Sequence, residues 1–228
     1  SINNLAGLSQ IESIGGNLSI DGNDSLTTLS GLNNLNSIDN LTITYNLSLN
    51  TLAGLDNLSF IKRGIDIRNN DTLATLKGLE NLTSINGDLS ISNNTSLITL
   101  EGLENLTSIG AILNISNNTM LKTLKGLKNL TSIGEFFRIS YNDSLSNLAG
   151  LNNLTTIGEW LGIIHNTNIK SLTGLDNLNS IGGDLFIVYN SSLINLEGFD
   201  NLNSINGLLW ISDNQNLIDI SSLKNIDP

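Results

Sequence analysis

Hydrophobic and polar residues follow one another along this chain in a pattern that repeats about every 24 residues. In the two clearest copies, LKGLENLTSINGDLSISNNTSLIT at 76–99 and LEGLENLTSIGAILNISNNTMLKT at 100–123, apolar residues occupy positions 1, 4, 7, 10, 14, 16 and 22. A fixed period of this length is the sequence signature of a solenoid, in which each repeat forms one coil. The pattern therefore predicts a rod or shallow arc of about nine stacked coils.

Positions 13 to 17 alternate between polar and apolar residues, as in DLSIS at 88–92, which predicts one short strand per repeat. We expect positions 14 and 16 to point into the core and positions 13, 15 and 17 to face solvent. Equivalent strands then stack as a parallel sheet with a spacing of about 4.7–4.9 Å. The apolar positions 1, 4, 7 and 10 recur every three residues, which favours short extended or 3₁₀ segments over a long helix. The predicted fold class is a β-rich solenoid with little α-helix.

An asparagine occupies position 19 in every copy, where it ends the predicted strand. Its side-chain amide can bond backbone groups of its own turn and of the next coil, and so satisfy polar atoms that stacking buries. Nine equivalent sites that keep one residue while their neighbours vary indicate a shared geometric requirement. We therefore predict a structural asparagine ladder formed by Asn23, Asn46, Asn70, Asn94, Asn118, Asn142, Asn166, Asn190 and Asn214.

Composition narrows the functional classes. The chain has 228 residues and no linker or shift in composition, so we expect a single domain over 1–228. Because the sequence starts and stops inside a repeat, we expect it to be a segment of a longer protein. The net charge of -11 argues against a nucleic-acid surface, and the absence of any 18-residue apolar run argues against membrane insertion. The absence of cysteine excludes disulfides and thiolate metal sites, and no repeat concentrates enough carboxylates for a Ca²⁺ shell. We expect no cofactor and no metal.

The motif GLENLTSIGG-x-L-x-I-x-x-N-x-x-L-x-x-L, present with small changes at 102–124 and 174–196, resembles leucine-rich repeats of the receptor L-domain type. The resemblance covers the whole chain and extends to fungal cell-wall proteins and bacterial leucine-rich-repeat surface proteins. It implies a right-handed solenoid that binds through a sheet face. The chain lacks the cysteine-rich ends of the receptor domains, so no receptor ligand residue is carried over. The frequent use of Asn and Ile without Cys favours an exported bacterial protein, extracellular or on the cell surface.

The outward positions differ between the two ends of the predicted sheet. Early copies carry small polar residues there, whereas seven of the ten aromatic residues occupy outward positions, mostly in the last four copies. Residues at one position on adjacent coils are neighbours, so this surface becomes an aromatic and apolar patch. Its predicted ligand-contacting residues are Phe136, Arg138, Tyr141, Trp160, Ile164, His165, Phe186, Val188, Tyr189, Leu208 and Trp210.

An exposed apolar patch rich in Trp and Tyr marks an interface more often than an accident. The sequence therefore predicts a non-enzymatic recognition or adhesion module that binds a protein or a glycan. The alternative is a structural spacer, in which an adjoining domain or a homodimer mate covers the patch. His165, the single histidine, lacks a nucleophile or carboxylate within its column, so we expect it to be stacked or to bond at the rim, with ligand contact or a pH-sensitive role as the alternative.

The polar half of the same face offers one enzymatic alternative. Asp66 and Asp88 are diagonal neighbours with Cα atoms expected about 8 Å apart, a separation that suits an inverting glycosidase. No aromatic platform flanks them, and Arg68 is expected to pair with an acid. We therefore expect a solvated face here. Triplets such as Asn81-Leu82-Thr83 would be glycan acceptors in a eukaryotic secretory route, although the repeat geometry accounts for them without glycans.

Overall fold

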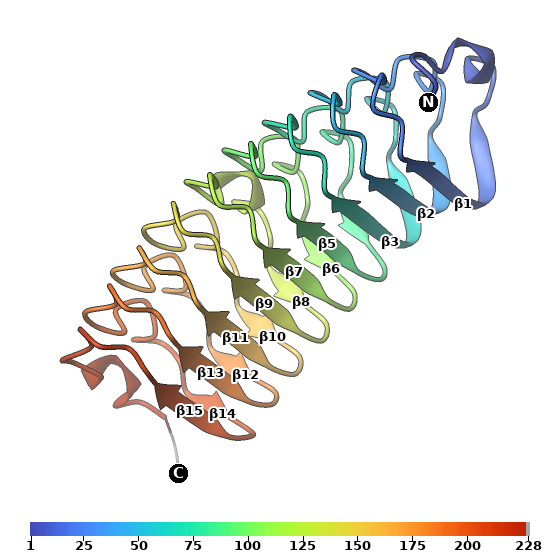
Figure 1. Ribbon diagram of the computed structural model, residues 1–228. Helices are drawn as coiled ribbons and strands as arrows, with labels where there is room; N and C mark the ends of the chain where they lie inside the picture. Colours follow the sequence, from blue (N-terminus) through green and yellow to red (C-terminus); the bar gives the residue numbers. More distant parts are fainter. Residues whose placement is uncertain (227–228) are drawn as a thin grey trace.

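The computed structural model describes residues 1–226 and is an elongated stack of coils (Figure 1). Each repeat contributes one strand to a continuous parallel ladder, and each strand pairs with its equivalent in the next coil, as Leu89 does with Leu113. The predicted solenoid is therefore confirmed. The strands of this ladder are β1 (Ser13–Asp21), β2 (Ser37–Thr44), β3 (Phe60–Arg68), β5 (Leu89–Ser92), β7 (Leu113–Ser116), β9 (Phe137–Ser140), β11 (Leu161–Ile164), β13 (Leu185–Val188) and β15 (Leu209–Ser212).

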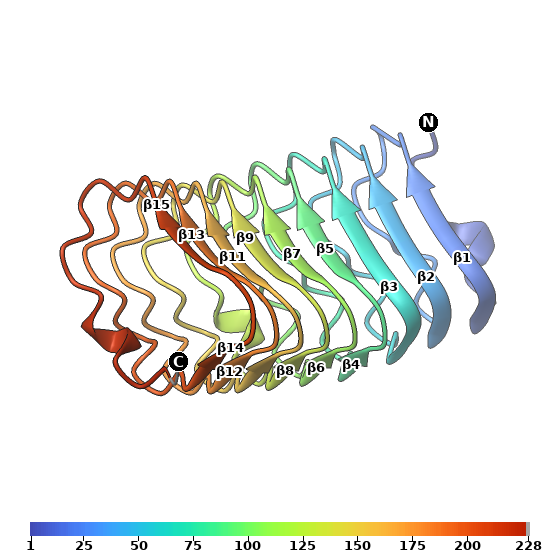
Figure 2. The same ribbon diagram turned by 90° about the horizontal axis from the view of Figure 1, so that it is seen from below.

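A second, shorter ladder runs beside the first and joins it through β3 (Figure 2). In the first three coils one long strand covers both ladders, whereas from the fourth coil on the chain bends at positions 11 to 13 and splits the strand in two. The register shifts between Ile38 and Asn40, because this coil has 23 residues instead of 24. The short strands are β4 (Ser84–Ile85), β6 (Ser108–Ile109), β8 (Ser132–Ile133), β10 (Thr156–Ile157), β12 (Ser180–Ile181) and β14 (Ser204–Ile205).

The core is a set of leucine and isoleucine columns that run the length of the stack. In the fifth coil the residues Leu100, Leu103, Leu106, Ile109 and Leu113 are all 0–1% exposed, so the predicted inward positions are confirmed. Helical structure in residues 1–226 is confined to the single-turn 3₁₀ segments η1 (Ala6–Leu8), η2 (Lys125–Leu127) and η3 (Ser221–Leu223), as the three-residue spacing predicts. Among these residues there is accordingly no helix that could cross a membrane.

The asparagine ladder is present, and each of its buried side chains satisfies two buried backbone groups of the preceding coil rather than of the next coil. The Asn118 side-chain amide donates to the carbonyl oxygen of Ile91 at 2.9 Å, and its oxygen accepts from the backbone N–H of Asn94 at 3.1 Å. The same bonds recur from coil to coil, which explains why no other residue is used at this position. The fully buried members are Asn46, Asn70, Asn94, Asn118, Asn142, Asn166 and Asn190, whereas Asn23 and Asn214, in the outermost coils, are partly exposed.

The residue at position 5 of each repeat decides how the glycine corner folds. Where it is Asn, Asp or Glu, its side chain accepts a hydrogen bond from the backbone N–H of the glycine at position 3, as Glu104 does from Gly102 at 2.8 Å. All seven such glycines have a φ of 113–118°. Where position 5 is Ser9, Lys128 or Lys224, no such bond forms and the corner folds into η1, η2 or η3 instead; in η3 the residue at position 3 is Ser222 rather than glycine.

Position 17 differs from the expectation that it faces solvent. Thr44, Ser92, Ser116 and Ser140 are buried there. In several coils the side chain at position 15 folds over position 17 of the same strand: Arg138 Nε donates to Ser140 Oγ at 3.2 Å, and the Asn114 amide to Ser116 Oγ at 3.3 Å. A small hydroxyl residue therefore fits this position because a longer neighbour covers it.

Candidate functional site

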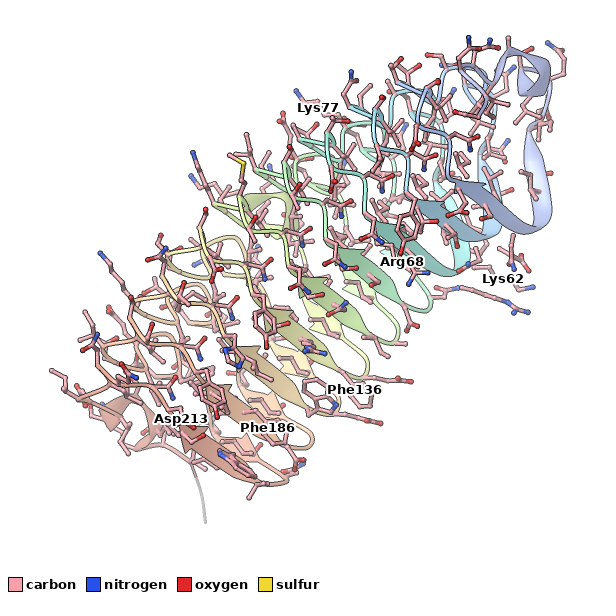
Figure 3. The ribbon with its side chains drawn as sticks, in the orientation of Figure 1. Lys62, Arg68, Lys77, Phe136, Phe186 and Asp213 are labelled. Atoms are coloured by element: carbon pink, nitrogen blue, oxygen red, sulfur yellow. The ribbon has the colours of Figure 1, made fainter. Side chains whose placement is uncertain are left out.

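Four aromatic side chains form a continuous chain of contacts across the outer surface of β9, β11, β13 and β15. Ring centroids lie 5.2 Å apart between Phe136 and Trp160, 6.1 Å between Trp160 and Phe186, and 6.5 Å between Phe186 and Trp210. Figure 3 shows Phe136 and Phe186 on the same side of the stack, with Arg68 on the N-terminal coils. The expectation that residues at one position on adjacent coils are neighbours is confirmed for Phe136 with Trp160 and for Phe186 with Trp210. The contact between Trp160 and Phe186 joins these two pairs into one strip.

A second column lies beside this strip, at position 18. The ring of His165 is stacked between Tyr141 and Tyr189, with centroid distances of 4.7 and 4.4 Å and interplanar angles of 9° and 12°. The expected stacked role of His165 is confirmed. Because the rings are nearly parallel at this spacing, the two tyrosines cover both faces of His165, and His165 covers one face of each tyrosine. We call the four-ring strip and this column together the aromatic face.

The backbone of this column is left-handed. Tyr141, His165 and Tyr189 have φ values of 55–59°, a region that Gly, Asn and Asp adopt far more readily than aromatic residues. Most other coils place Gly22, Asn69, Asn93, Asn117 or Asp213 at the same position, in keeping with that preference, but Tyr45 of the second coil is also left-handed although it lies outside the aromatic face. Three successive coils therefore carry an aromatic ring where local backbone preference favours asparagine. Residues held against their conformational preference are common at functional sites.

Gly162 explains how the indole of Trp160 is seated. It is the glycine at position 15 of β11, where neighbouring strands carry Arg138 and Phe186. A Cβ atom added to Gly162 would lie 2.6 Å from Cζ3 of Trp160, so the ring covers this glycine and buries it. Gly162 was not among the predicted site residues, although a lone glycine inside a strand is a signal of close approach.

We expect Gly162→Ala to displace the Trp160 indole, because the new methyl group would occupy the space under the ring. The backbone φ of Gly162 is not left-handed, so alanine fits the main chain and stability should change little. In a Trp210→Phe background, Trp160 fluorescence should shift to longer wavelength and become easier to quench with acrylamide. Ser90→Ala, at the same position of β5, is the matched control. An unchanged Trp160 spectrum in Gly162→Ala would contradict this seating.

The remaining predicted site residues lie on the same surface with different exposures. Ile164 and Val188 are half-buried cross-strand partners at position 17, and Leu208 is 51% exposed at the last coil. Arg138 is exposed and donates to Ser140 rather than to a carboxylate. Trp210 is 52% exposed, and its Nε1 donates to Ser212 Oγ at 2.9 Å. The structure thus brings all eleven predicted residues onto one face.

A shallow pocket of about 380 Å³ opens at the edge of the aromatic face, lined by Glu159, Trp160, Gly182, Gly183 and Asp184. One carboxylate oxygen of Asp184 accepts from the backbone N–H of Leu208 at 2.7 Å. A Cβ atom at Gly207 would lie 2.2 Å from that same oxygen, so glycine there leaves room for the Asp184 carboxylate. Carboxylates and an indole ring therefore meet in one recess.

On the polar half of the sheet face, Asp66 and Asp88 each interact with a partner of their own. The Asp66 carboxylate lies 3.3 Å from Nε of Arg68, as expected, and Asp88 accepts from the backbone N–H of Ile112 at 3.1 Å. A pocket of about 300 Å³ is lined by Asp88 together with Lys62 and Arg63, and Asp66 is not part of it. Among residues 1–226, no three His, Asp or Glu side chains gather closely enough to hold a metal ion.

Burial raises the pKa of Asp66 above its ordinary value of 3.8, and the nearby Arg68 only partly opposes this. The folded state therefore favours the protonated acid, and the stability that this gives is lost as the pH rises through the raised pKa. We expect Asp66→Asn to melt at a higher temperature than the native chain at pH 7, with the difference shrinking as the pH falls through the raised pKa and gone once the pH is below about 3.8. Thermal melts at pH 3 and pH 7 measure this. A variant that is less stable at pH 7 would contradict the assignment.

Comparison with known proteins adds little to this picture. No family model and no curated protein matches the chain. Among solved structures, the chain is similar to a leucine-rich repeat protein from Bacteroides ovatus, with 15% identity over 92% of this chain and 70% of that chain and a TM-score of 0.29. A likeness this low does not contribute to the assignment. The repeat, the parallel ladders and the stacked leucines make this chain a parallel β-solenoid with a buried asparagine ladder, and its repeat motif resembles leucine-rich repeats.

Proposed function

We propose that this chain is a non-enzymatic recognition or adhesion module of an exported or cell-surface protein, and that it binds a protein or glycan partner through the aromatic face. The observation that carries the proposal is a connected set of outward rings confined to the later coils, with Trp210, Tyr141 and Tyr189 39–52% exposed. Core packing does not require these rings, because the inward positions of the same strands are filled by leucine, isoleucine and phenylalanine.

Two features of the backbone support the same proposal. The chain accepts left-handed aromatic residues at position 18, which costs about 1–3 kcal/mol for each non-glycine residue held in such a conformation. It also uses a glycine at position 15 of β11, where the indole of Trp160 then rests. At both positions the chain carries a residue that is unfavourable for the local backbone but that allows an aromatic ring to lie on the surface. Such conflicts between local preference and final structure are expected at functional sites.

Under the spacer hypothesis, the aromatic face is covered by an adjoining domain of a longer protein or by a homodimer mate, and not by a separate ligand. It is distinguished by comparing this chain with a longer form that extends beyond residues 1–228. If Trp160 and Trp210 are protected from acrylamide in the longer chain without any added ligand, the spacer hypothesis is favoured. If they stay accessible until a partner is added, recognition is favoured.

We expect Trp160→Ala combined with Trp210→Ala to weaken partner binding by at least about thirtyfold, since anchoring aromatics typically contribute about 2 kcal/mol or more. The melting temperature should change little, because Trp210 is exposed and Trp160 is half-buried. A combined glycan and peptide array probed with this chain selects the ligand, and biolayer interferometry then measures the Kd.

The matched control removes two other exposed aromatic residues, Tyr45 and Phe60, which lie in the early coils and are 54% and 46% exposed. Tyr45→Ala with Phe60→Ala should bind like the native chain. Undiminished binding by the tryptophan variant, or an equal loss in the control, would remove the proposed site.

A further inference from the structure

Acidic side chains border the aromatic face along the loop between the short and long strands. Glu135 and Glu159 occupy position 12 of adjacent coils, and the backbone N–H of Glu159 donates to the carbonyl oxygen of Glu135 at 2.9 Å. In the next coil, the carbonyl oxygen of Asp184 accepts from the N–H of Leu161 at 2.9 Å, directly after Trp160. The main chain therefore brings these three acidic residues next to Phe136 and Trp160, and Glu159 and Asp184 line the pocket beside Trp160.

These carboxylates lack basic partners within the described residues 1–226. The ion pairs found there are Lys62–Asp39, Arg68–Asp66 and Lys77–Glu101, all in the first five coils. Arg138 lies on the aromatic face, but its Nε donates to Ser140. Like charges on neighbouring strands repel one another, so an uncompensated acidic border is unfavourable in the free chain. A partner that brings positive charge relieves this repulsion, whereas a neutral partner does not.

The ring geometry also bears on the kind of partner. Sugar-binding platforms present free ring faces, but both faces of the His165 ring, and the faces of Tyr141 and Tyr189 that point toward it, are covered at centroid distances of 4.4–4.7 Å. The inner face of the Trp160 ring rests over Gly162. The rings of the aromatic face are therefore only partly free, and the exposed Leu208 and Trp210 add an apolar patch that suits the branched apolar side chains of a polypeptide. The net charge of -11 further favours a basic partner, because complementary charge steers association.

We propose that the partner of the aromatic face is a polypeptide segment in which Arg or Lys alternates with apolar residues. The apolar side chains contact the strip from Phe136 to Trp210. One basic side chain enters the 380 Å³ pocket beside Trp160, where Glu159 and Asp184 face its charge. This inference rests on the proposed function and specifies the partner of the same site.

The test uses a synthetic peptide of three Leu-Leu-Arg-Arg units, which places Leu and Arg on each side of an extended strand. A second peptide replaces every Arg by citrulline and so keeps the shape but removes the charge. We expect the native chain to bind the arginine peptide at least tenfold more tightly in 150 mM salt. Glu159→Gln with Asp184→Asn should remove most of that preference. Asp24→Asn with Asp71→Asn removes the same charge from exposed sites on the early coils and should retain it.

Three outcomes would overturn the inference: no binding of the arginine peptide, equal binding of the citrulline peptide, or an equal loss in the Asp24 and Asp71 control. Tighter binding of a neutral oligosaccharide such as cellohexaose would overturn it in favour of a glycan. The proposed function is tested separately by Trp160→Ala with Trp210→Ala. If that variant loses an array ligand that the Glu159 and Asp184 variant still binds equally well, the aromatic site stands and the basic partner does not.

Discussion

Asn118→Ala is expected to lower the free energy of unfolding by about 2–6 kcal/mol, because it leaves two buried backbone groups without partners at a cost of about 1–3 kcal/mol each. These groups are the carbonyl of Ile91 and the N–H of Asn94, which the Asn118 side chain now satisfies at 2.9 and 3.1 Å. Water cannot replace the lost bonds, because Asn118 and its neighbours in the ladder are fully buried. Urea denaturation of the native and variant chains measures the difference.

Asn105→Ala is the matched control for this substitution. Asn105 is exposed, and its side-chain amide makes one bond, 2.7 Å long, to the carbonyl oxygen of Glu80 in the preceding coil. Water can take over that bond, so we expect a loss of about 1 kcal/mol or less. Equal losses for Asn105→Ala and Asn118→Ala would mean that the buried ladder has no special role in holding the coils together.

Gly102→Ala is expected to destabilise the fold by about 2–4 kcal/mol, from left-handed strain and overpacking acting together. Gly102 has a φ of 115°, and a Cβ atom there would lie 2.1 Å from the backbone carbonyl oxygen of Leu76. A backbone atom of the neighbouring coil cannot move aside as a side chain can, so the strain would extend into the stack. Thermal and urea unfolding of the variant give the magnitude.

Gly7→Ala provides the comparison, because Gly7 occupies the same repeat position in the first coil. It lies in η1, its φ is not left-handed, and a Cβ atom there would meet nothing within 4 Å. Alanine should therefore be tolerated or slightly stabilising, since it restricts the unfolded chain. A Gly102→Ala variant as stable as Gly7→Ala would show that the corner can relax without cost.

Much of the fold follows from the sequence because the repeat multiplies each weak signal. One alternating stretch such as DLSIS would be an uncertain strand, but nine copies in one phase predict a parallel ladder and its inward residues. The same reasoning placed Phe136 beside Trp160 and His165 between two tyrosines, because equivalent positions on adjacent coils must be neighbours. These predictions depend only on stacking in register, which the strand pairing confirms.

A second asparagine ladder was not predicted, although asparagine recurs at position 6. There each side-chain amide donates to a carbonyl oxygen of the preceding coil at 2.6–2.8 Å. The signal was visible as the first residue of the Asn-Leu-Thr triplets, whose regular spacing was attributed to the repeat without a bonding role for the amide. The residues concerned are Asn34, Asn57, Asn81, Asn105, Asn129, Asn153, Asn177, Asn201 and Asn225.

The corner conformations and the seat of Trp160 were not predictable from the repeat pattern, because they depend on contacts within one coil. The contrast between Glu104 and Lys128 at position 5 looks like a surface charge variation, yet it selects between a left-handed glycine and a 3₁₀ turn. Gly162 looks like a gap in an outward column, yet it leaves the space that the Trp160 ring fills. In each case one side chain contacts its own strand or turn. A pattern that is read from all the repeats together does not reveal such a contact, because it occurs in only some coils.

In this solenoid, different residues of each coil hold the fold together and form the proposed binding surface. Throughout the stack, ladders and leucine columns fix the backbone, while the outward residues of the last four coils are free to vary without disturbing the core. That separation is why aromatic rings can collect there and why their removal should affect binding more than stability. The polar coils from β1 to β5 provide an internal reference on the same sheet, with the same backbone and different side chains.

The central claim, that a partner occupies the aromatic face, is tested most directly by site-specific photocross-linking. The photoreactive residue p-benzoylphenylalanine would replace Phe186 on the aromatic face, Tyr45 on the early coils, or Met120 at the exposed turn of the fifth coil. Each chain would be irradiated with the tightest ligand from the array. Our account predicts a strong cross-link from position 186 and little from positions 45 and 120. Cross-linking from position 45 or 120 with none from position 186 would contradict it.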